Sequence, residues 1–490
     1  MIEKQQKHQK EQQKNKGITV KKEENMPEWY EQVLLKSELA DHAPVKGCMV
    51  IRPEGYAIWQ AIQDYFNPVM QKYGVKNVYF PMFIPESFFE REATHAKGFK
   101  AEVAWIEPKG EAKQRYAIRP TSETIMYDAF SRWIRSWRDL PLRINQWCNI
   151  CRWEVQDCKL FLRSREFLWQ EGHCVYETEQ ECEKEAQAML KEYKKLCEEL
   201  LAIPVIAGRK TEKEKFAGAK TTYTIETLMP DGKASQCGTS HNLGQVFAKA
   251  FGIMFKNKDM KEKLPWQSSW GISTRLIGAT VMMHSDNKGL VLSPKIAAIQ
   301  VVVVPILFDD SKIKVLKAAE KIVKELKKSG VRVHLDNRTE YSPGWKFNEW
   351  ELKGVMLRVE IGPRDLEKKH CILVHRHTGK KEIIKLTHLK KEIHITLEKM
   401  HHDLFKNAEK NIQENTATAE NWDQFLKAIK AKKWVKVYFH ESEEYEAEIK
   451  EKTSGVTARC IPLTSSVPNG KKCFYSGKDA TVEVIFGRNY

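Results

Sequence analysis

Residues 152–173 read RWEVQDCKLFLRSREFLWQEGH, and this stretch decides how the centre of the chain folds. A polar loop separates two runs in which aromatic and charged residues are mixed, and this pattern predicts two strands joined as a hairpin. Trp169, Glu171 and His173 are two residues apart, so they are expected on one face of the second strand. Arg152 and Glu154 repeat that spacing at the start of the stretch.

Pairs of polar residues with a spacing of two also occur on either side of this stretch. A single such pair usually marks the solvated face of a strand. Pairs that are flanked by Trp, Phe and Leu predict instead that several strand faces converge on a pocket that contains Arg, Glu and His. The further pairs are Thr121 with Glu123, Thr239 with His241, and Ser273 with Arg275.

Spacing alone leaves two interpretations of residues 152–173 open. Two arginines beside a cleft suit a triphosphate, because guanidinium groups pair bidentately with phosphate oxygens, and a Phe offers a flat face for a base. Alternatively, the stretch is a surface hairpin whose Arg and Glu side chains pair with each other.

The composition narrows the class of protein. The 490 residues include 81 Lys and Arg against 65 Asp and Glu, a formal net charge of +16. This excess favours a polyanionic partner or, alternatively, a basic solvated surface. Eleven cysteines and the lack of a secretory leader predict reduced thiols in a cytoplasmic protein, and no apolar run is long enough to span a bilayer.

Local patterns predict the organisation outside the pocket. Residues 1–24 are rich in Lys, Gln and Glu and are expected to be a disordered tail. Residues 179–202 have the apolar period of an amphipathic helix. The other expected elements are a strand at 299–305, a helix at 311–328 and a strand at 331–335 that form a small parallel α/β unit, a helical region at 401–430, and strands at 434–438 and 481–486.

Several strings resemble a known enzyme family. Arg152-x-Glu154, a loop and Arg163-x-x-x-Phe167-x-x-x-Glu171 resemble motif 2 of the class II aminoacyl-tRNA synthetases. Residues 271–275 (GISTR) resemble their motif 3, and residues 74–81 (GVKNVYFP) resemble motif 1, which builds the dimer interface of that class. The strings that resemble prolyl-tRNA synthetases, of the archaeal and eukaryotic cytosolic type, are 119–123 (RPTSE), 169–173 (WQEGH), 238–241 (GTSH), 344–354 (GWKFNEWELKG) and 360–365 (EIGPRD).

The resemblance implies an α/β fold with three folded domains. These would be a class II catalytic domain at 25–297, with an antiparallel sheet flanked by helices, a small α/β anticodon-binding domain at 298–400, and a small α+β domain at 401–490. It also implies the activity: the enzyme activates L-proline with ATP to prolyl-adenylate and pyrophosphate, and then transfers proline to the 3′ end of tRNA(Pro).

The resemblance further implies a role for each site residue. Arg152, Arg163 and Arg275 would stabilise charge during catalysis. The residues implied for L-proline are Thr121, Glu123, Arg152, Trp169, Glu171, His173, Phe216 and His241. The residues implied for ATP are Arg152, Glu154, Arg163, Phe167, Gln236, Thr239, Ser273 and Arg275. Candidates for contacts with the anticodon bases are Arg338, Glu340, Glu360 and Arg364.

The expected cofactors are ATP, as a substrate, and Mg²⁺ that bridges its phosphates. Relatives often hold a structural zinc with four cysteines in the C-terminal domain, where this chain has only Cys460 and Cys473. A tetrahedral site needs four ligands, and His440 would raise the number to three, so zinc is not expected. Cys148 and Cys151 have metal-motif spacing but are expected to be buried on opposite faces of a strand. Cys237 replaces a glycine, and is expected to crowd the ATP site or to expose a reactive thiol.

The expected partners are tRNA(Pro) and a second copy of the chain, with neither a membrane nor DNA. The alternatives are a threonyl or histidyl synthetase, a non-catalytic tRNA-binding relative, and a basic RNA-binding protein without activity. The proline-pocket strings argue against the first, and the presence of the ATP-contacting residues argues against the second. The third alternative leaves the ordered strings unexplained. No long insertion separates Glu171 from Gln236, where bacterial relatives carry an editing domain.

Overall fold

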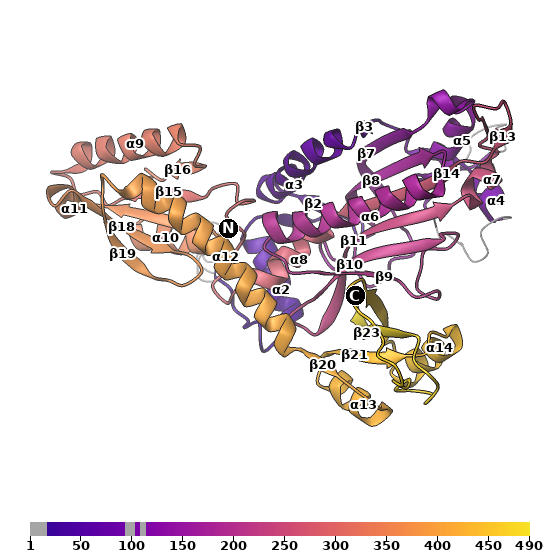
Figure 1. Cartoon of the computed structure of the whole chain (residues 1–490). Coiled ribbons are helices and arrows are strands. Elements are labelled where there is room, and N and C mark those ends of the chain that lie inside the picture. The colour runs from indigo at the N-terminus through magenta and orange to yellow at the C-terminus, as the bar shows by residue number, and fades with distance from the viewer. Residues whose placement is uncertain (1–16, 94–102, 108–113) are drawn as a thin grey trace.

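The computed structural model describes residues 17–93, 103–107 and 114–490 (Figure 1). A long mixed sheet forms its centre, and the neighbouring strands from β9 to β7 are antiparallel, whereas β3 joins β7 in parallel. The strands of the sheet, in their order across it, are β20 (Thr416–Thr418), β21 (Trp434–Phe439), β23 (Val482–Asn489), β22 (Thr457–Pro462), β9 (Ile206–Arg209), β10 (Thr221–Leu228), β11 (Lys233–Gly244), β14 (Trp266–Ser273), β8 (Glu166–Tyr176), β7 (Leu142–Cys151) and β3 (Lys76–Asn77).

Helices α2 (Met26–Lys36), α3 (Pro53–Lys72), α6 (Glu179–Lys195) and α8 (Arg275–His284) supply much of the apolar core beside this sheet. Helix α6 begins with a capping box between Thr178 and Glu181 and continues as a π-helix to Leu200, which confirms the helix expected at 179–202. A Cβ on Gly172 of β8 would lie 2.2 Å from the Trp270 ring, so only glycine lets β14 approach so closely.

A separate apolar cluster includes Tyr127, Phe130, Phe247 and Phe251 from helices α5 (Glu123–Trp133) and α7 (Val246–Phe251). Helix α5 carries Glu123 at its first turn and therefore fixes one wall of the pocket described below. The remaining elements of this part of the chain are β1 (Ala40–His42), β2 (Met49–Ile51), β4 (Phe83–Pro85), α4 (Glu86–Ala93), β5 (Trp105–Ile106), β6 (Tyr116–Ile118), the 3₁₀ turn at Trp137–Asp139, β12 (Phe255–Lys256) and β13 (Glu262–Lys263).

A second sheet lies between residues 301 and 385, in the order β16-β15-β17-β18-β19. The first pair of strands along the chain is parallel and is connected by helix α9, which confirms the expected parallel α/β unit. Its elements are β15 (Val301–Pro305), α9 (Lys312–Lys328), β16 (Val333–Leu335), α10 (Pro343–Leu352), β17 (Leu357–Ile361), α11 (Pro363–Glu367), β18 (His370–His375) and β19 (Lys381–Lys385).

Helix α12 (Leu389–Glu414) runs from this second sheet to the C-terminal strands (Figure 1). The boundary expected between residues 400 and 401 therefore lies inside a continuous helix. The helical region expected at 401–430 is interrupted by β20 and resumes only with α13 (Trp422–Lys430), because Thr416 pairs with Trp434 in a strand. Helix α14 (Glu443–Lys452) completes this part, and β22 pairs with β9, so the C-terminal strands extend the central sheet.

The prediction of a disordered tail at 1–24 is wrong for its last residues, 17–24. Residues 1–16 lie outside the described part of the chain. The Lys22 amine donates to the carbonyls of Met282 (2.8 Å) and Ser285 (3.1 Å), and Thr19 bonds to Gln32. The other charges of this polar segment also have partners, since Lys21 pairs with Glu24 and Glu23 accepts from the Asn287 amide. Among the described residues, no helix combines the length and the apolar character that a membrane crossing requires.

Candidate active site

A pocket of about 400 Å³ opens on the face of the central sheet between β8, β11 and the start of α5. It brings together residues that are more than a hundred positions apart in the sequence. The site residues expected from the sequence that line it are Thr121, Glu123, Arg152, Glu154, Trp169, Glu171, His173, Phe216, Gln236, Thr239 and His241.

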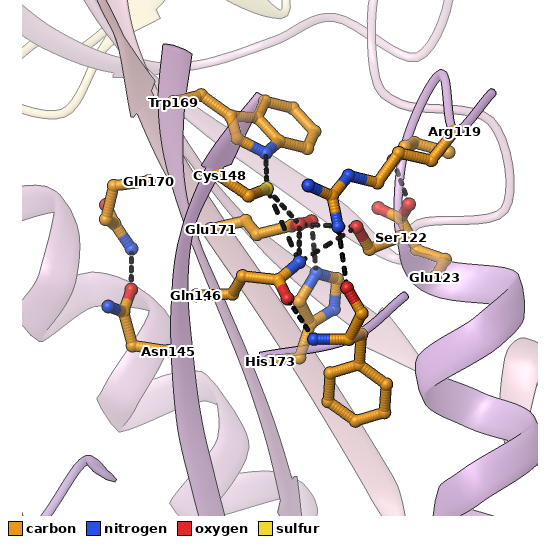
Figure 2. Close-up of polar contacts among 12 residues, drawn as sticks. Arg119, Ser122, Glu123, Asn145, Gln146, Cys148, Trp169, Gln170, Glu171 and His173 are labelled. Carbon is orange, nitrogen blue, oxygen red and sulfur yellow. Dashed lines mark hydrogen bonds and ion pairs between the residues drawn. The ribbon is translucent and has the colours of Figure 1, made fainter. Parts of the chain in front are cut away.

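Glu171 lines this pocket and lies at the centre of a buried network, whose contacts Figure 2 shows. The Ser122 hydroxyl donates to one carboxylate oxygen at 2.5 Å and the Gln146 amide donates to the same oxygen at 3.0 Å. His173 bonds to the other oxygen at 3.1 Å. Burial alone would raise the pKa of Glu171, but the hydrogen bonds from His173, Ser122 and Gln146 outweigh it and lower the pKa.

His173 is held on both ring nitrogens. Its Nε2 bonds to Glu171, and its Nδ1 lies 3.1 Å from the Tyr127 hydroxyl of α5. Burial lowers the pKa of His173, yet the Glu171 hydrogen bond and the charge of Glu123 raise it overall above the usual value. The buried pair is therefore stabilised as imidazolium and carboxylate, and it fixes the floor of the pocket.

Thr121 and Glu123 come from a turn rather than from the strand expected for them. Glu123 begins helix α5, and the Thr121 hydroxyl bonds to its carboxylate. Arg119 anchors this turn from within the protein: it is 1% exposed, and its guanidinium donates to the carbonyls of Phe80 (2.8 Å) and Asn149 (2.9 Å). The turn therefore presents a buried hydroxyl and a buried carboxylate toward the pocket.

Aromatic rings form the side walls. The Trp169 indole donates to the Cys148 thiol at 3.1 Å, which orients the ring (Figure 2). Phe216 packs on His241 with a ring separation of 5.0 Å. Burial, with a smaller contribution from His173, lowers the pKa of His241 to about 3, so this imidazole is neutral at physiological pH.

Arg152 stands at the mouth of the pocket directly after β7. Its guanidinium lies 5.6 Å from the Phe167 ring centre and 5.7 Å from that of Trp169, and it donates to the Pro120 carbonyl at 3.4 Å. Burial lowers the pKa of Arg152, although Glu154, Glu123 and Glu171 oppose this effect. The strand expected to hold Arg152 and Glu154 ends at Cys151, so both lie in the following turn.

The remaining predicted ATP residues lie outside the pocket lining. Arg275 begins α8, where its side chain donates to the carbonyls of Leu162 (3.1 Å) and Gln236 (3.5 Å), and its backbone amide donates to Ser273. The strand expected for Ser273 and Arg275 thus ends between them. Arg163 is exposed in the β7–β8 connection and lines a neighbouring hollow instead.

The burial of Cys237 contradicts the exposed thiol expected of it, and Cys237 does not line the pocket. Strand alternation would put it on the pocket face with Thr239, but Ile225 of β10 pairs with Gly238 and Glu226 pairs with Gln236, which leaves Cys237 in a β-bulge. The bulge turns the thiol into the core, where it is 3% exposed. Cys237 therefore does not line the pocket, and its thiol is buried and not exposed to reagents.

The described cysteines do not gather with other potential metal ligands. Within residues 17–93, 103–107 and 114–490, no group of three or more His, Cys, Asp or Glu side chains could hold a metal ion. Cys460 and Cys473 are buried, and His440 bonds to the Asp479 carbonyl at 2.9 Å. Cys148 is partly buried beside Glu171, whereas Cys151 is buried at the end of β7.

The sequence reasoning missed the residues that support the pocket. Ser122, Gln146 and Tyr127 hold the Glu171–His173 pair and carry no recognisable spacing relative to it. Glu171 pairs with Gln146 across β7 and β8, so only the strand register identifies this partner. The missed lining residues are Pro120, Glu214, Thr222, Ser269, Trp270 and Gly271.

The anticodon-contact candidates divide into two groups. Arg338 donates to Asp336 at 2.7 Å and to Glu349 at 2.5 Å, and Glu360 is 4% exposed and bonded to Arg358. These two are therefore held in ion pairs. Glu340 and Arg364 are exposed.

Comparison with known proteins identifies relatives over nearly the whole length of the chain. Residues 100–284 match the tRNA synthetase class II core domain (G, H, P, S and T), residues 300–394 the anticodon binding domain, and residues 422–490 the prolyl-tRNA synthetase C-terminal family. Proline–tRNA ligase 2 of Clostridioides difficile is 47% identical over 473 residues, which cover 96% of this chain and 97% of the relative. The cytoplasmic proline–tRNA ligase of Arabidopsis thaliana is 42% identical over 483 residues, covering 97% and 91% respectively.

Proposed function

The chain belongs to the prolyl-tRNA synthetases, and on that premise we propose how its residues divide the work of the reaction. It is a proline–tRNA ligase that activates L-proline with ATP to prolyl-adenylate and pyrophosphate, and then transfers proline to the 3′ end of tRNA(Pro). The observation that supports the proposed roles best is the pocket in which Glu123, Arg152 and the Glu171–His173 pair meet.

L-Proline is placed in the deep part of the pocket. The carboxylate of Glu123 and the hydroxyl of Thr121 accept hydrogen bonds from its secondary ammonium group. Trp169, Phe216 and His173 surround the pyrrolidine ring, and neutral His241 adds no charge against it. The Glu171–His173 pair is buried below and keeps this wall in one conformation.

ATP is placed at the outer part of the pocket. Arg152 binds the α-phosphate together with the proline carboxylate, and Glu154 accepts from the adenine amine. Phe167 and Arg275 enclose the adenine ring, while Arg163 and Arg275 hold the outer phosphates. Gln236, Thr239 and Ser273 complete the contacts with ATP.

The first step needs no general base, because the proline carboxylate is already ionised. One of its oxygens attacks the α-phosphorus, and the bond to the bridging oxygen of pyrophosphate breaks. Catalysis then consists of positioning and of charge stabilisation by the three arginines. Mg²⁺ prefers a few carboxylates plus phosphate oxygens and water. Glu214, which lines the pocket and has no other role assigned here, would supply such a carboxylate, and the ion would neutralise phosphate charge.

In the second step a terminal ribose hydroxyl of tRNA(Pro) attacks the prolyl carbonyl carbon, the anhydride bond to the AMP phosphate breaks, and the departing phosphate takes the hydroxyl proton. The anticodon, as a single-stranded loop, is read by the domain that contains residues 300–394. Exposed Glu340 and Arg364 are better placed for base contacts than Arg338 and Glu360, since the latter are already paired.

The remaining assignments are proposals on the same premise. The catalytic domain covers residues 25–297, and the segment from residue 17 packs on it. The chain is of the archaeal and eukaryotic cytosolic type. It works in the cytoplasm, which is where the name of the Arabidopsis relative places that protein. A homodimer forms through residues 74–81. Edge strand β3 and exposed Tyr79 (72%) and Phe83 (48%) support this interface.

Amino-acid-dependent exchange of pyrophosphate into ATP tests the proposed roles. The purified chain with Mg²⁺ is expected to exchange with L-proline far faster than with threonine or histidine. Arg152→Ala is expected to reduce exchange by about 10²–10³-fold, the usual effect of removing one donor that stabilises transition-state charge. An Arg152→Ala enzyme with unchanged exchange would contradict the assignment of this residue.

A further inference from the structure

A groove of about 890 Å³ lies between the N-terminal segment, the β10–β11 turn and the C-terminal strands. Its lysines come from four separate parts of the chain, so the fold and not a local run gathers them. They are Lys22, Lys159, Lys233, Lys430, Lys432 and Lys433. Three acidic residues, Glu23, Glu24 and Asp231, also line the groove, which leaves an excess of positive charge.

Most of these lysines are free to bind an anion. In the described part of the chain, Lys159, Lys233, Lys430 and Lys432 form no ion pair, and the Lys433 amine donates only to the Glu414 carbonyl at 2.8 Å. Lys430 and Lys432 are exposed and follow one another across the turn after α13. Neutralisation by neighbouring carboxylates therefore does not account for this cluster.

Lys159 and Lys233 form the inner end of the groove. Their amines lie 5.4 and 5.2 Å from the centre of the same ring, that of the C-terminal residue Tyr490. After burial, the charge of Lys233 is the largest cause of the lowered pKa of Lys159. Two ammonium groups held this close repel each other, and a bound anion would relieve that repulsion.

The groove adjoins a second hollow. This hollow, of about 590 Å³, shares Lys159 and Asp231 with the groove and reaches Arg163. The backbones of Lys159 and Arg163 are paired, with N–O distances of 2.7 and 2.9 Å. A flexible polyanion that lies along the lysines would thus end beside the arginine assigned to the outer phosphates of ATP.

We propose that this groove binds the sugar-phosphate backbone of the acceptor end of the tRNA. The proposal rests on the function proposed above, which requires the 3′ end to reach the pocket. Lysines on flexible stems suit the phosphates of a single strand, because they act as point charges without demanding one geometry. The C-terminal strands, which extend the catalytic sheet, thereby help to position the acceptor end of the tRNA.

Neutralising the two outermost lysines tests the groove without touching the pocket. K430Q/K432Q is compared with K450Q/K478Q, which removes two exposed charges from the same part of the chain outside the groove. Binding is measured without ATP or proline by fluorescence anisotropy, with full tRNA(Pro), an acceptor-stem minihelix ending in its 3′ single strand, and an anticodon stem-loop.

K430Q/K432Q is expected to weaken binding of tRNA(Pro) and of the minihelix by about 5–20-fold and to reduce the slope of log Kd against log salt by about 1.4, since each single-strand phosphate contact contributes about 0.7. Binding of the anticodon stem-loop and proline-dependent pyrophosphate exchange are expected to stay unchanged. The control variant is expected to behave like the parent in every assay.

Two results would overturn the proposal. In the first, minihelix affinity and its salt slope are the same in K430Q/K432Q as in the parent. In the second, the variant binds RNA normally but shows weaker inhibition by pyrophosphate, which would assign the groove to the leaving group. A parent protein that binds tRNA but lacks proline-dependent exchange would contradict the proposed function and leave the measured RNA contact standing.

Discussion

Glu123 combines burial with a charge that has no ion-pair partner among the described residues of the pocket; its carboxylate meets only the Thr121 hydroxyl. If it accepts from the proline ammonium, Glu123→Gln removes a charge-assisted hydrogen bond worth about 1.5–3 kcal/mol, because such bonds are stronger than neutral ones. We expect kcat/KM for proline in pyrophosphate exchange to fall about 10–150-fold, with KM for ATP nearly unchanged.

The matched control for this change is Glu166→Gln. Glu166 is an exposed carboxylate at the start of β8 that bonds to Asn149 and does not line the pocket. The Glu166→Gln substitution is expected to leave kcat/KM for proline and KM for ATP within about twofold of the parent values, the range of surface substitutions. If Glu123→Gln lowered kcat/KM equally for proline and for ATP, Glu123 would shape the whole pocket and would not select proline.

A substitution at Cys237 tests whether its side chain points into the core, as the β-bulge implies, or into the pocket, as regular strand alternation would imply. Because the β-bulge turns its thiol into the core, we expect Cys237→Ala to leave KM for ATP within about twofold and to lower the melting temperature. A thiol reagent is expected to label Cys237 only after unfolding, as peptide mass analysis would detect. If the native protein were labelled fast and ATP prevented this labelling, Cys237 would lie at the nucleotide site instead.

At the scale of elements, α14 docks on the catalytic part through a carboxyl group with an unusual pKa. Glu446 is 4% exposed, and the Thr211 hydroxyl donates to it at 2.9 Å. Burial and the charges of Glu214 and Glu441 raise its pKa to about 7. Between the usual pKa of a Glu, about 4.5, and this raised pKa, the folded state keeps a proton on Glu446 that the unfolded state has released. The free energy of unfolding therefore decreases as the pH rises from about 4.5 to 7.

Glu446→Gln imitates the protonated form and removes this pH dependence. We expect it to raise the melting temperature at pH 8 by several degrees, and by clearly less at pH 5.5, since a shift of one pKa unit corresponds to about 1.4 kcal/mol. Glu444→Gln, an exposed change on the same helix, is the control and should have no effect. Equal stabilisation by Glu446→Gln at both pH values would show that Glu446 is ionised in the folded protein.

Elements with strong periodicity were predictable, and elements defined by long-range pairing were not. The apolar period of 179–202 specifies α6, and the strand–helix–strand pattern at 299–335 specifies β15, α9 and β16. Spacing of two placed Thr239 and His241 correctly on β11, but Thr121 with Glu123 and Ser273 with Arg275 straddle the start of a helix. Local spacing cannot distinguish a strand face from a helix start, because the same two-residue spacing occurs in both.

At the scale of the whole molecule, the sequence motifs identified most of the pocket but not what holds it. The motif strings contain Glu171 and His173, whereas Gln146 supports them from a strand outside every string, and Ser122 lies in a string without a role being recognised for it. The continuation of the central sheet through β9 and β22 into the C-terminal part also has no local signal. The buried ion pair between Glu226 and Arg459 joins the two parts, and Lys210, which also pairs with Glu226, donates to the Arg459 carbonyl at 2.8 Å.

The chain connects β8 to β11 only through α6, a π-helical turn, β9 and β10, so this region of the described structure holds no additional domain. A pocket that surrounds proline with aromatic rings cannot strongly reject alanine, because the missing methylene groups are worth only about 1–3 kcal/mol. We therefore expect alanine-dependent pyrophosphate exchange at about 10–200-fold lower kcat/KM than with proline. We also expect pre-formed Ala-tRNA(Pro) to be deacylated no faster with the pure protein than in buffer. Rapid release of alanine would require a hydrolytic site in the chain, and the same assay with Glu123→Gln would separate a site in this pocket from one elsewhere.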